Sequence, residues 1–265
     1  RIYTWKELEA QGLMQDDPQY RKIDHAEGFR FIGFKGNLNN HLPCKNLIDA
    51  GVIHGHQMIH KFGRAVGPAN GQWSNVWNGG GMIPFTGLNL VAPTIVSTGA
   101  DTVDIQIKGV KLENGDWNIA TYTITLTGTT PVVIPGDIMS VYRMTNVGAV
   151  DLVGDVTLQD GATVYAKIVA GPYNSTQMAW MPIPTGYVGM PVKFGASIDT
   201  GKAAQIAYRY RAFGQVARLA MIFDISGQKI SGDVEYSFDE KTILDAICKP
   251  TIAGTDVTAN FDVIL

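Results

Sequence analysis

Alternating hydrophobic and polar positions run through most of the chain after about residue 70, and this pattern predicts β-strands. The clearest case is the segment 103–126. From Val103 to Ile107 every second residue is apolar, which is the period of a strand with one buried face. The return leg, 121–126, alternates in the same way, and Asn114-Gly115 between the legs accepts the positive φ angles of a tight reversal. An isolated hairpin is marginal in water, so we expect the remaining sequence to cover one of its faces.

The same alternation recurs at short intervals to the end of the chain. About a dozen short strands at this spacing are typical of sandwiches and jelly rolls. We therefore predict a mainly β fold, an antiparallel and jelly-roll-like sandwich over residues 71–265, with a candidate division near 147–153. Only Lys241–Ile247 and the first few residues have a helical pattern. The further strands are expected in the segments 89–98, 132–134, 138–146, 152–168, 178–184, 188–196, 205–224, 234–238 and 257–265.

Residues 1–70 have a different residue pattern, with scattered apolar residues between glycines and polar residues. A short helix is expected over 5–13, with Thr4 as its N-cap. Phe29, Phe31 and Phe34 are too few to build a core. This composition predicts an extended N-terminal arm that packs on a neighbouring surface, since ordering it costs about 1–2 kcal/mol per residue in backbone entropy.

Composition narrows the function classes. The chain has 265 residues, of which 17% are charged, and a formal net charge of -3, whereas a dedicated nucleic-acid binder normally carries a basic stripe. No run approaches the roughly 18 apolar residues of a membrane span, so we expect neither membrane nor sequence-specific nucleic-acid partners. Cys44 and Cys248 are the only cysteines, too few for a disulfide scaffold.

Three histidines lie close together in the predicted arm: His54, His56 and His60. Helical i, i+4 spacing would join His56 to His60 in a metal site, because imidazole is a common metal ligand. No carboxylate or cysteine stands at ligand spacing, however, and Gly55 weakens a helix there. The alternative is a polar surface whose histidines form hydrogen bonds, and we predict no cofactor.

Tryptophans offer a second possible binding chemistry. Trp73 and Trp77 precede the glycine run 79–81, and Trp117 and Trp180 follow later. Exposed indoles stack on sugar rings, but large aromatic residues in a sandwich are more often core or interface groups. The glycine run lacks the spacing and the Lys-Ser/Thr pair of a phosphate-binding loop.

No catalytic motif is found, and we predict a protein that is not an enzyme. Paired carboxylates are the residue types that glycoside hydrolysis uses, and the candidates are Asp101 with Asp104, Asp151 with Asp155, and Asp239 with Glu240. Their places in or beside turns favour solvated loop charges instead. Three arginines, Arg209, Arg211 and Arg218, are expected on one face of the 205–224 hairpin, where they would pair with a neighbouring subunit or keep that face soluble.

A set of short motifs over residues 70–265 resembles virion structural proteins of tailed bacteriophages, especially marine and freshwater ones. Residues 1–70 match nothing that we can name. The motifs are the strand from Val103, Gly115 to Asn118, Thr125 to Pro131, Tyr142 to Met144, Thr163 to Ile168, Gln177 to Ala179, Pro184-x-Gly186, Glu240 to Thr242 and Asn260 to Leu265.

The resemblance implies a virion location, and it supplies no catalytic residues. The expected function is that of a capsid decoration or cement protein on the head exterior, with the major capsid protein and sister copies, in a homotrimer, as partners. The alternatives are a tail, neck, baseplate or fibre component, and a carbohydrate-binding module that contacts host glycans. The residues expected at interfaces are Trp5, Phe29, Phe31, Phe34, Trp73, Trp77, Arg209 and Arg211.

Overall fold

The computed structural model describes residues 48, 55–227, 229–232 and 236–265. The chain separates into two compact units, residues 1–58 and 59–265, and nearly all described residues belong to the second. Sixteen β-strands are found among the described residues, and they form four sheets. The expected mainly β, antiparallel sandwich is therefore confirmed.

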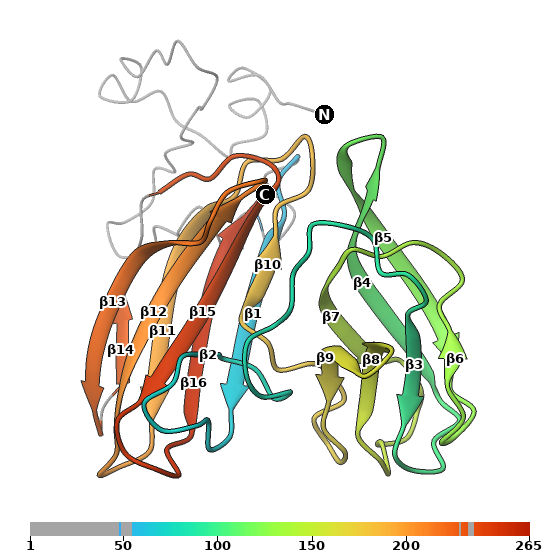
Figure 1. Cartoon of the computed structure of the whole chain (residues 1–265), viewed down its shortest axis with the longest axis horizontal. Coiled ribbons are helices and arrows are strands. Elements are labelled where there is room, and N and C mark those ends of the chain that lie inside the picture. Colours follow the sequence, from blue (N-terminus) through green and yellow to red (C-terminus); the bar gives the residue numbers. More distant parts are fainter. Residues whose placement is uncertain (1–47, 49–54, 228, 233–235) are drawn as a thin grey trace, which may run out of the picture. The chain divides into compact units, whose positions relative to one another are not determined.

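Eight strands form a jelly roll, drawn on the left of Figure 1. One sheet has the order β1-β16-β11-β14, and the other has the order β10-β15-β12-β13. Numbered along the chain among themselves, these strands run 1-8-3-6 and 2-7-4-5, which is the double Greek key of a jelly roll. The strands are β1 (Met58–Ala65), β10 (Trp180–Pro182), β11 (Met190–Ile198), β12 (Ala203–Ala212), β13 (Arg218–Ser226), β14 (Lys229–Gly232), β15 (Thr242–Pro250) and β16 (Val257–Ile264).

A second sandwich is inserted between the first two strands of the jelly roll. This inserted sandwich, residues 78–177, has one sheet of order β6-β3-β8-β9 and another of order β5-β4-β7. Its strands are β3 (Thr94–Ser97), β4 (Asp104–Glu113), β5 (Asp116–Thr125), β6 (Val132–Val133), β7 (Ser140–Asn146), β8 (Val156–Asp160) and β9 (Thr163–Ile168).

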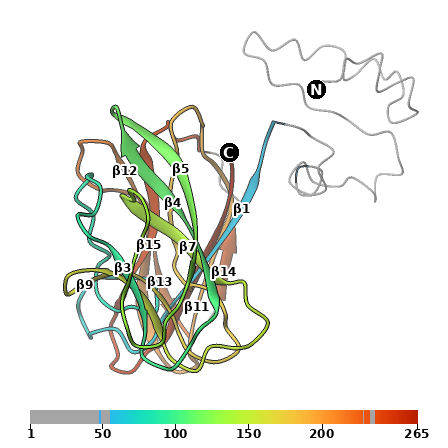
Figure 2. The same cartoon turned by 90° about the vertical axis from the view of Figure 1, so that its right-hand side faces the viewer.

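The hairpin predicted around Asn114-Gly115 is confirmed as β4 and β5. The two strands pair without interruption from Asp104 opposite Thr125 to Glu113 opposite Asp116. Asn114 has φ 55° and Gly115 has φ 86°, the left-handed pair that a two-residue hairpin turn requires. In Figure 2 this hairpin lies on the side turned toward the viewer.

The inserted sandwich leaves and rejoins the jelly roll at one point on the edge of β15. Strand β2 (Ser74–Asn75) pairs with one end of β15, and β10 pairs with the other end. Val76 N donates to Ala246 O at 2.9 Å, and Ala179 N donates to Val76 O at 3.0 Å. Because the two ends of the insert lie side by side, the insertion leaves the jelly-roll topology intact.

Two buried clusters follow these two sandwiches. One fills the space between the jelly-roll sheets, with Ile206 and Val263 fully buried. The other fills the inserted sandwich around Ile105 and Trp117, and it also takes in Trp180 from the jelly roll. The second cluster therefore continues across the junction.

Three sequence-based expectations need correction. The boundary at residue 70 is wrong, because β1 (Met58–Ala65) is already a strand of the jelly roll. Residues 147–153 form a loop between β7 and β8 within the inserted sandwich, so they do not divide domains. Lys241–Ile247 is not a helix, since β15 spans Thr242–Pro250. Both faces of β15 are buried, so its apolar residues form a run rather than an alternation.

Candidate interaction surfaces

Several of the predicted interface residues lie outside the described residues. These are Trp5, Phe29, Phe31 and Phe34. His54, Cys44, the short helix over 5–13 and most of the expected arm lie outside them as well. In the described part of the chain, no helix has the length and apolar character that a membrane crossing requires.

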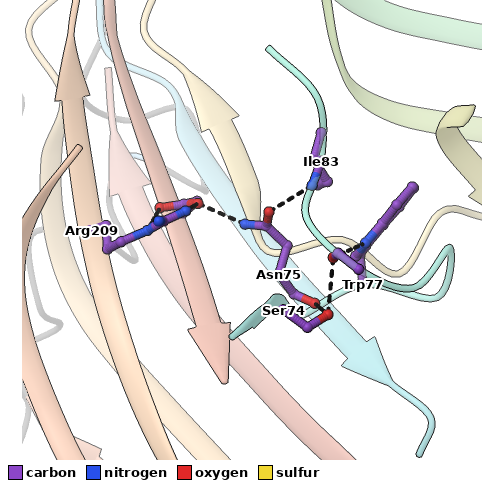
Figure 3. A network of polar contacts seen from close by, with 7 residues as sticks. Ser74, Asn75, Trp77, Ile83 and Arg209 are labelled. Carbon is purple, nitrogen blue, oxygen red and sulfur yellow. Dashed lines mark hydrogen bonds and ion pairs between the residues drawn. The ribbon is translucent and has the colours of Figure 1, made fainter. Parts of the chain in front are cut away.

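Trp77 is buried, with 2% of its surface exposed, so it cannot contact a partner or a sugar as expected. The carbonyl oxygen of Gly81 accepts hydrogen bonds from Trp77 Nε1 at 3.0 Å, Ser74 Oγ at 2.9 Å and Asn75 N at 3.0 Å (Figure 3). A Cβ atom on Gly79 would lie 2.2 Å from the Trp77 ring. The glycine run thus lets the backbone fold closely over the indole.

Arg209 is also a structural residue rather than an exposed one. Its guanidinium binds both oxygens of Asp245, through Nε at 3.1 Å and through a terminal nitrogen at 2.5 Å. Asn75 Nδ2 donates to the same carboxylate at 2.6 Å, and Asn75 Oδ1 accepts from Ile83 N at 2.8 Å (Figure 3). The network fastens β12 and β15 to the segment that enters the inserted sandwich. The guanidinium of Arg209 is therefore engaged within its own chain, and its expected contact with another subunit stays a prediction.

Arg211 lies at an aromatic seam between the jelly roll and the insert. Its guanidinium is 5.7 Å from the ring centroid of Phe85. The Phe85 ring lies 5.9 Å from Trp117 and 6.1 Å from Trp180, and Trp117 lies 5.8 Å from Phe213. Edge contacts of this kind contribute about 0.5–1.5 kcal/mol each beyond the apolar area that they bury. Arg211 therefore supports the seam from within its own chain.

Only Trp73, among the four tryptophans considered for sugar binding, keeps a partly accessible ring. It is half-buried, and Lys249 Nζ lies 6.0 Å from its ring centroid. Trp117 and Trp180 are buried, as Trp77 is. A sugar platform of several stacked indoles is thus not formed by the described residues, and this disfavours the carbohydrate-binding alternative.

Asp101, proposed as half of a catalytic pair, ties two loops together. It is buried, and it accepts hydrogen bonds from Ser97 Oγ at 2.5 Å, Val153 N at 2.8 Å and Gly154 N at 2.9 Å. Burial by itself would raise the pKa of Asp101, but these hydrogen bonds outweigh it and hold the pKa below its ordinary value. The carboxylate is therefore charged and fully engaged at neutral pH.

The other paired carboxylates have their own structural partners. Asp104 accepts from Thr125 Oγ1 at 2.5 Å, and Asp151 accepts from Asn174 Nδ2 at 2.6 Å. Asp155 forms an ion pair with Lys167 at 2.7 Å, and this pair lowers the pKa of Asp155. Asp101 and Asp104 thus have different hydrogen-bond partners, and so do Asp151 and Asp155.

The histidine hypothesis gains no support from the geometry. His60 Nδ1 lies 2.9 Å from Asp262 Oδ1, a contact between β1 and β16. Within the described ranges, no three His, Cys, Asp or Glu side chains gather in a group able to hold a metal ion. His54 lies outside the described residues, so its part in the hypothesis is untested.

Strand β1 also clasps the inserted sandwich through β7. Lys61 Nζ donates to the carbonyl oxygen of Tyr142, and an Arg143 guanidinium nitrogen donates to the carbonyl oxygen of His60 at 2.6 Å. Lys61 is buried, and this burial, with a smaller effect of Arg143, lowers its pKa well below the ordinary value. The clasp is a third connection between the two sandwiches, beside the Arg209 network and the aromatic seam.

Among the described residues, a small cavity of about 30 Å³ lies in the jelly roll, lined largely by apolar groups including Tyr208, Met221, Phe238 and Phe261. That volume suits about one water molecule, whereas pockets for small organic ligands measure roughly 300–1,000 Å³. The cavity therefore does not suit a small organic ligand.

A surface that the sequence analysis missed is the outer edge of β5. Ile119, Thr121, Thr123 and Thr125 are exposed there, and β5 ends the sheet order β5-β4-β7. A sequence signal for it exists, because no charged residue lies between Asp116 and Asp137. Charged side chains are a usual protection of edge strands, and their absence here is informative.

Comparisons with known proteins add no identification. No protein-family model, no curated protein and no solved structure matches this chain.

Proposed function

We propose that this chain is a non-enzymatic structural protein of a phage particle, and that it decorates the head as a cement or minor capsid protein. The observation that carries the proposal is the connection of the two sandwiches at three places. The Arg209 network, the aromatic seam around Phe85 and the clasp from Lys61 all cross the same junction. A body held at three places suits a protein that bears load rather than one that closes on a substrate.

The carboxylates support the same proposal. The buried Asp101 and Asp245 serve loop closure and strand fastening. A buried charge that is fully hydrogen-bonded stabilises one arrangement, and removing its partners costs several kcal/mol. These charged groups therefore contribute to rigidity, as expected of a shell component. The resemblance of residues 70–265 to phage virion proteins supports the proposed location in a virion.

The proposed partners are the major capsid protein and sister copies. Many weak contacts repeated over a shell add up, because each bound copy raises the effective concentration of the next contact. A rigid body transmits such contacts without losing conformational entropy at each one. Binding of this chain would thus stiffen the shell against internal pressure.

The test is to find the protein in the intact particle. A cryo-electron-microscopy reconstruction, with quantitative mass spectrometry of purified particles, gives its position and copy number. We expect density on the outside of the head and roughly hundreds of copies, as coverage of a shell requires. A position at the neck or tail, with about a dozen copies or fewer per particle, would refute the head assignment and favour the tail alternative.

A second arm of the test uses the soluble protein. Emptied heads that lack the chain are heated with and without added purified protein. The proposal expects saturable binding and a higher temperature of head disruption. Heads that bind none of the protein would contradict a decoration role.

A further inference from the structure

The outer edge of β5 presents backbone groups that are ready to pair. In a two-residue hairpin the residues that close the turn, Glu113 and Asp116, form hydrogen bonds with each other. The backbone N–H and C=O groups of Trp117, and of every second residue after Trp117, therefore point away from β4. Trp117 fits this pattern, since its N–H donates to Thr185 Oγ1 at 2.8 Å and its carbonyl accepts from Thr185 N at 3.0 Å. The next outward groups belong to Ile119, Thr121 and Thr123.

Those outward groups have no hydrogen-bond partner within the described part of the chain. Ile119, Thr121 and Thr123 are also exposed, Ile119 by 47% of its surface. An unpaired row of N–H and C=O groups on an exposed strand is a template for another strand. At the end of β5 next to the turn, the bonds between Trp117 and Thr185 show that these outward backbone groups form hydrogen bonds with another segment.

The other edge strands carry protections that β5 lacks. Strands β7, β9 and β13 have bulges in their pairing, and β6, β10 and β14 are two to four residues long. Strand β1 carries Lys61 and Arg64. Strand β5 has ten residues in regular register, with no proline, no glycine and no charge after Asp116. Its sequence thus does nothing to prevent pairing.

We infer that β5 pairs antiparallel with β5 of a second copy of this chain, about a two-fold axis at Thr121. This register places Thr121 opposite itself, and it places Ile119 opposite Thr123 of the other copy. Thr–Thr and β-branched cross-strand pairs are favourable, and no like charges meet, because the paired stretch has none. The contact is self-complementary, as a two-fold interface must be.

Thr185 sets the length of the pairing. The next pair in this register would join Thr125 to Trp117, but the Trp117 backbone groups are already bonded to Thr185. The shared ladder therefore ends at Ile119 and Thr123, and the two β5-β4-β7 sheets become one six-stranded sheet. A partner strand with charged side chains would place these charges beside the uncharged side chains of β5. The β5 strand of a second copy has no charge in the paired stretch, which favours it as the partner. This two-fold contact joins copies in pairs, so a trimer would need another surface.

The test measures the mass of the whole chain in solution by light scattering and analytical ultracentrifugation over a concentration series. We expect a reversible monomer–dimer equilibrium. Thr121→Pro removes the outward N–H at the axis while leaving the bonds to β4, because proline is tolerated at such edge positions. Thr121→Lys places two positive charges opposite each other. Each change should weaken the dimer about ten- to hundredfold.

Thr163→Lys is the matched control, an exposed threonine on the bulged edge strand β9. It should leave the dimer constant unchanged. Circular dichroism and thermal melts establish that each variant is folded. Amide exchange gives a second measure, since dimer formation should protect the amides of Ile119, Thr121 and Thr123 but not change the amides already bonded to β4.

A chain that stays monomeric at all concentrations overturns the inference, and so does a dimer that both Thr121 variants leave intact. Protection confined to another strand would also overturn it. None of these results depends on where the protein is found in a particle, so failure here is distinguishable from failure of the proposed function.

Discussion

Replacing Asp101 with asparagine tests whether this carboxylate holds the fold or performs chemistry. The side chain is 4% exposed and accepts three hydrogen bonds, from Ser97 Oγ, Val153 N and Gly154 N. An amide has one acceptor oxygen in place of two. In Asp101→Asn the –NH2 group must therefore face at least one of these backbone donors.

The cost follows from that geometry. Losing a hydrogen bond to a charged acceptor costs about 1.5–3 kcal/mol, and the orphaned buried N–H adds a desolvation penalty. We expect Asp101→Asn to lower the free energy of unfolding by about 3 kcal/mol. For a chain of this size that corresponds to a drop in Tm of about 6–12 °C.

The assay is urea and thermal unfolding followed by tryptophan fluorescence, with Asp104→Asn as the control. Asp104 is exposed and accepts one bond, from Thr125 Oγ1, which an amide oxygen can also accept. The free energy of unfolding of the control should stay within about 0.5 kcal/mol of that of the unchanged protein.

The difference in stability between Asp101→Asn and the unchanged protein should also depend on pH. Since hydrogen bonds hold the pKa of Asp101 below 3.8 in the folded state, its stabilisation is present above that pH and is lost as pH falls through the folded pKa.

Equal stability of the Asp101→Asn and Asp104→Asn variants at pH 6 would refute this account of the loop tie. Hydrolase activity abolished by Asp101→Asn without loss of stability would overturn the non-enzymatic proposal as well.

Three further predictions follow from buried groups. Burial lowers the pKa of Lys61 in the folded state. Above that lowered pKa the unfolded chain binds more protons than the folded chain, so the free energy of unfolding should rise with pH toward 10.5. Lys61→Met should flatten this rise between pH 7 and 10, as measured by urea titrations. Gly79→Ala should cost about 1–3 kcal/mol in the same assay, because the new methyl would overlap the Trp77 ring, and unchanged stability would contradict that packing. Burial raises the pKa of Cys248 to about 12, so in a Cys44→Ser background its thiol should react with a thiol reagent only after unfolding; rapid reaction of the folded protein would show that it is accessible.

The strands of the sandwich could be predicted from alternating apolar and polar residues where one face of the strand is buried and the other is exposed to solvent. The 103–126 hairpin is of this kind, and so is the first half of β16, residues 257–260. Strand β1 was missed because its buried positions after Ile59 are Lys61, Gly63 and Ala65, which carry almost no hydrophobic signal. Local pattern cannot detect a strand whose burial depends on distant partners.

Residue type alone could not separate surface groups from structural ones. Trp77 and Arg209 are residue types enriched at protein interfaces, which made them reasonable interface candidates. Their burial depends on Gly81 and Asp245, which follow at very different separations along the chain. Only the tertiary arrangement reveals such pairings.

The place of the insert has a consequence for how the polypeptide is made. Residues 78–177 contain both of their own sheets, so each strand of this portion can find its partners before the jelly roll has been synthesised in full. The jelly roll cannot close at that time, because β1 pairs with β16, which is synthesised last. We therefore expect the inserted sandwich to form its sheets while the jelly roll still lacks β16. Termination of synthesis before β16 would then leave β1 without its partner strand.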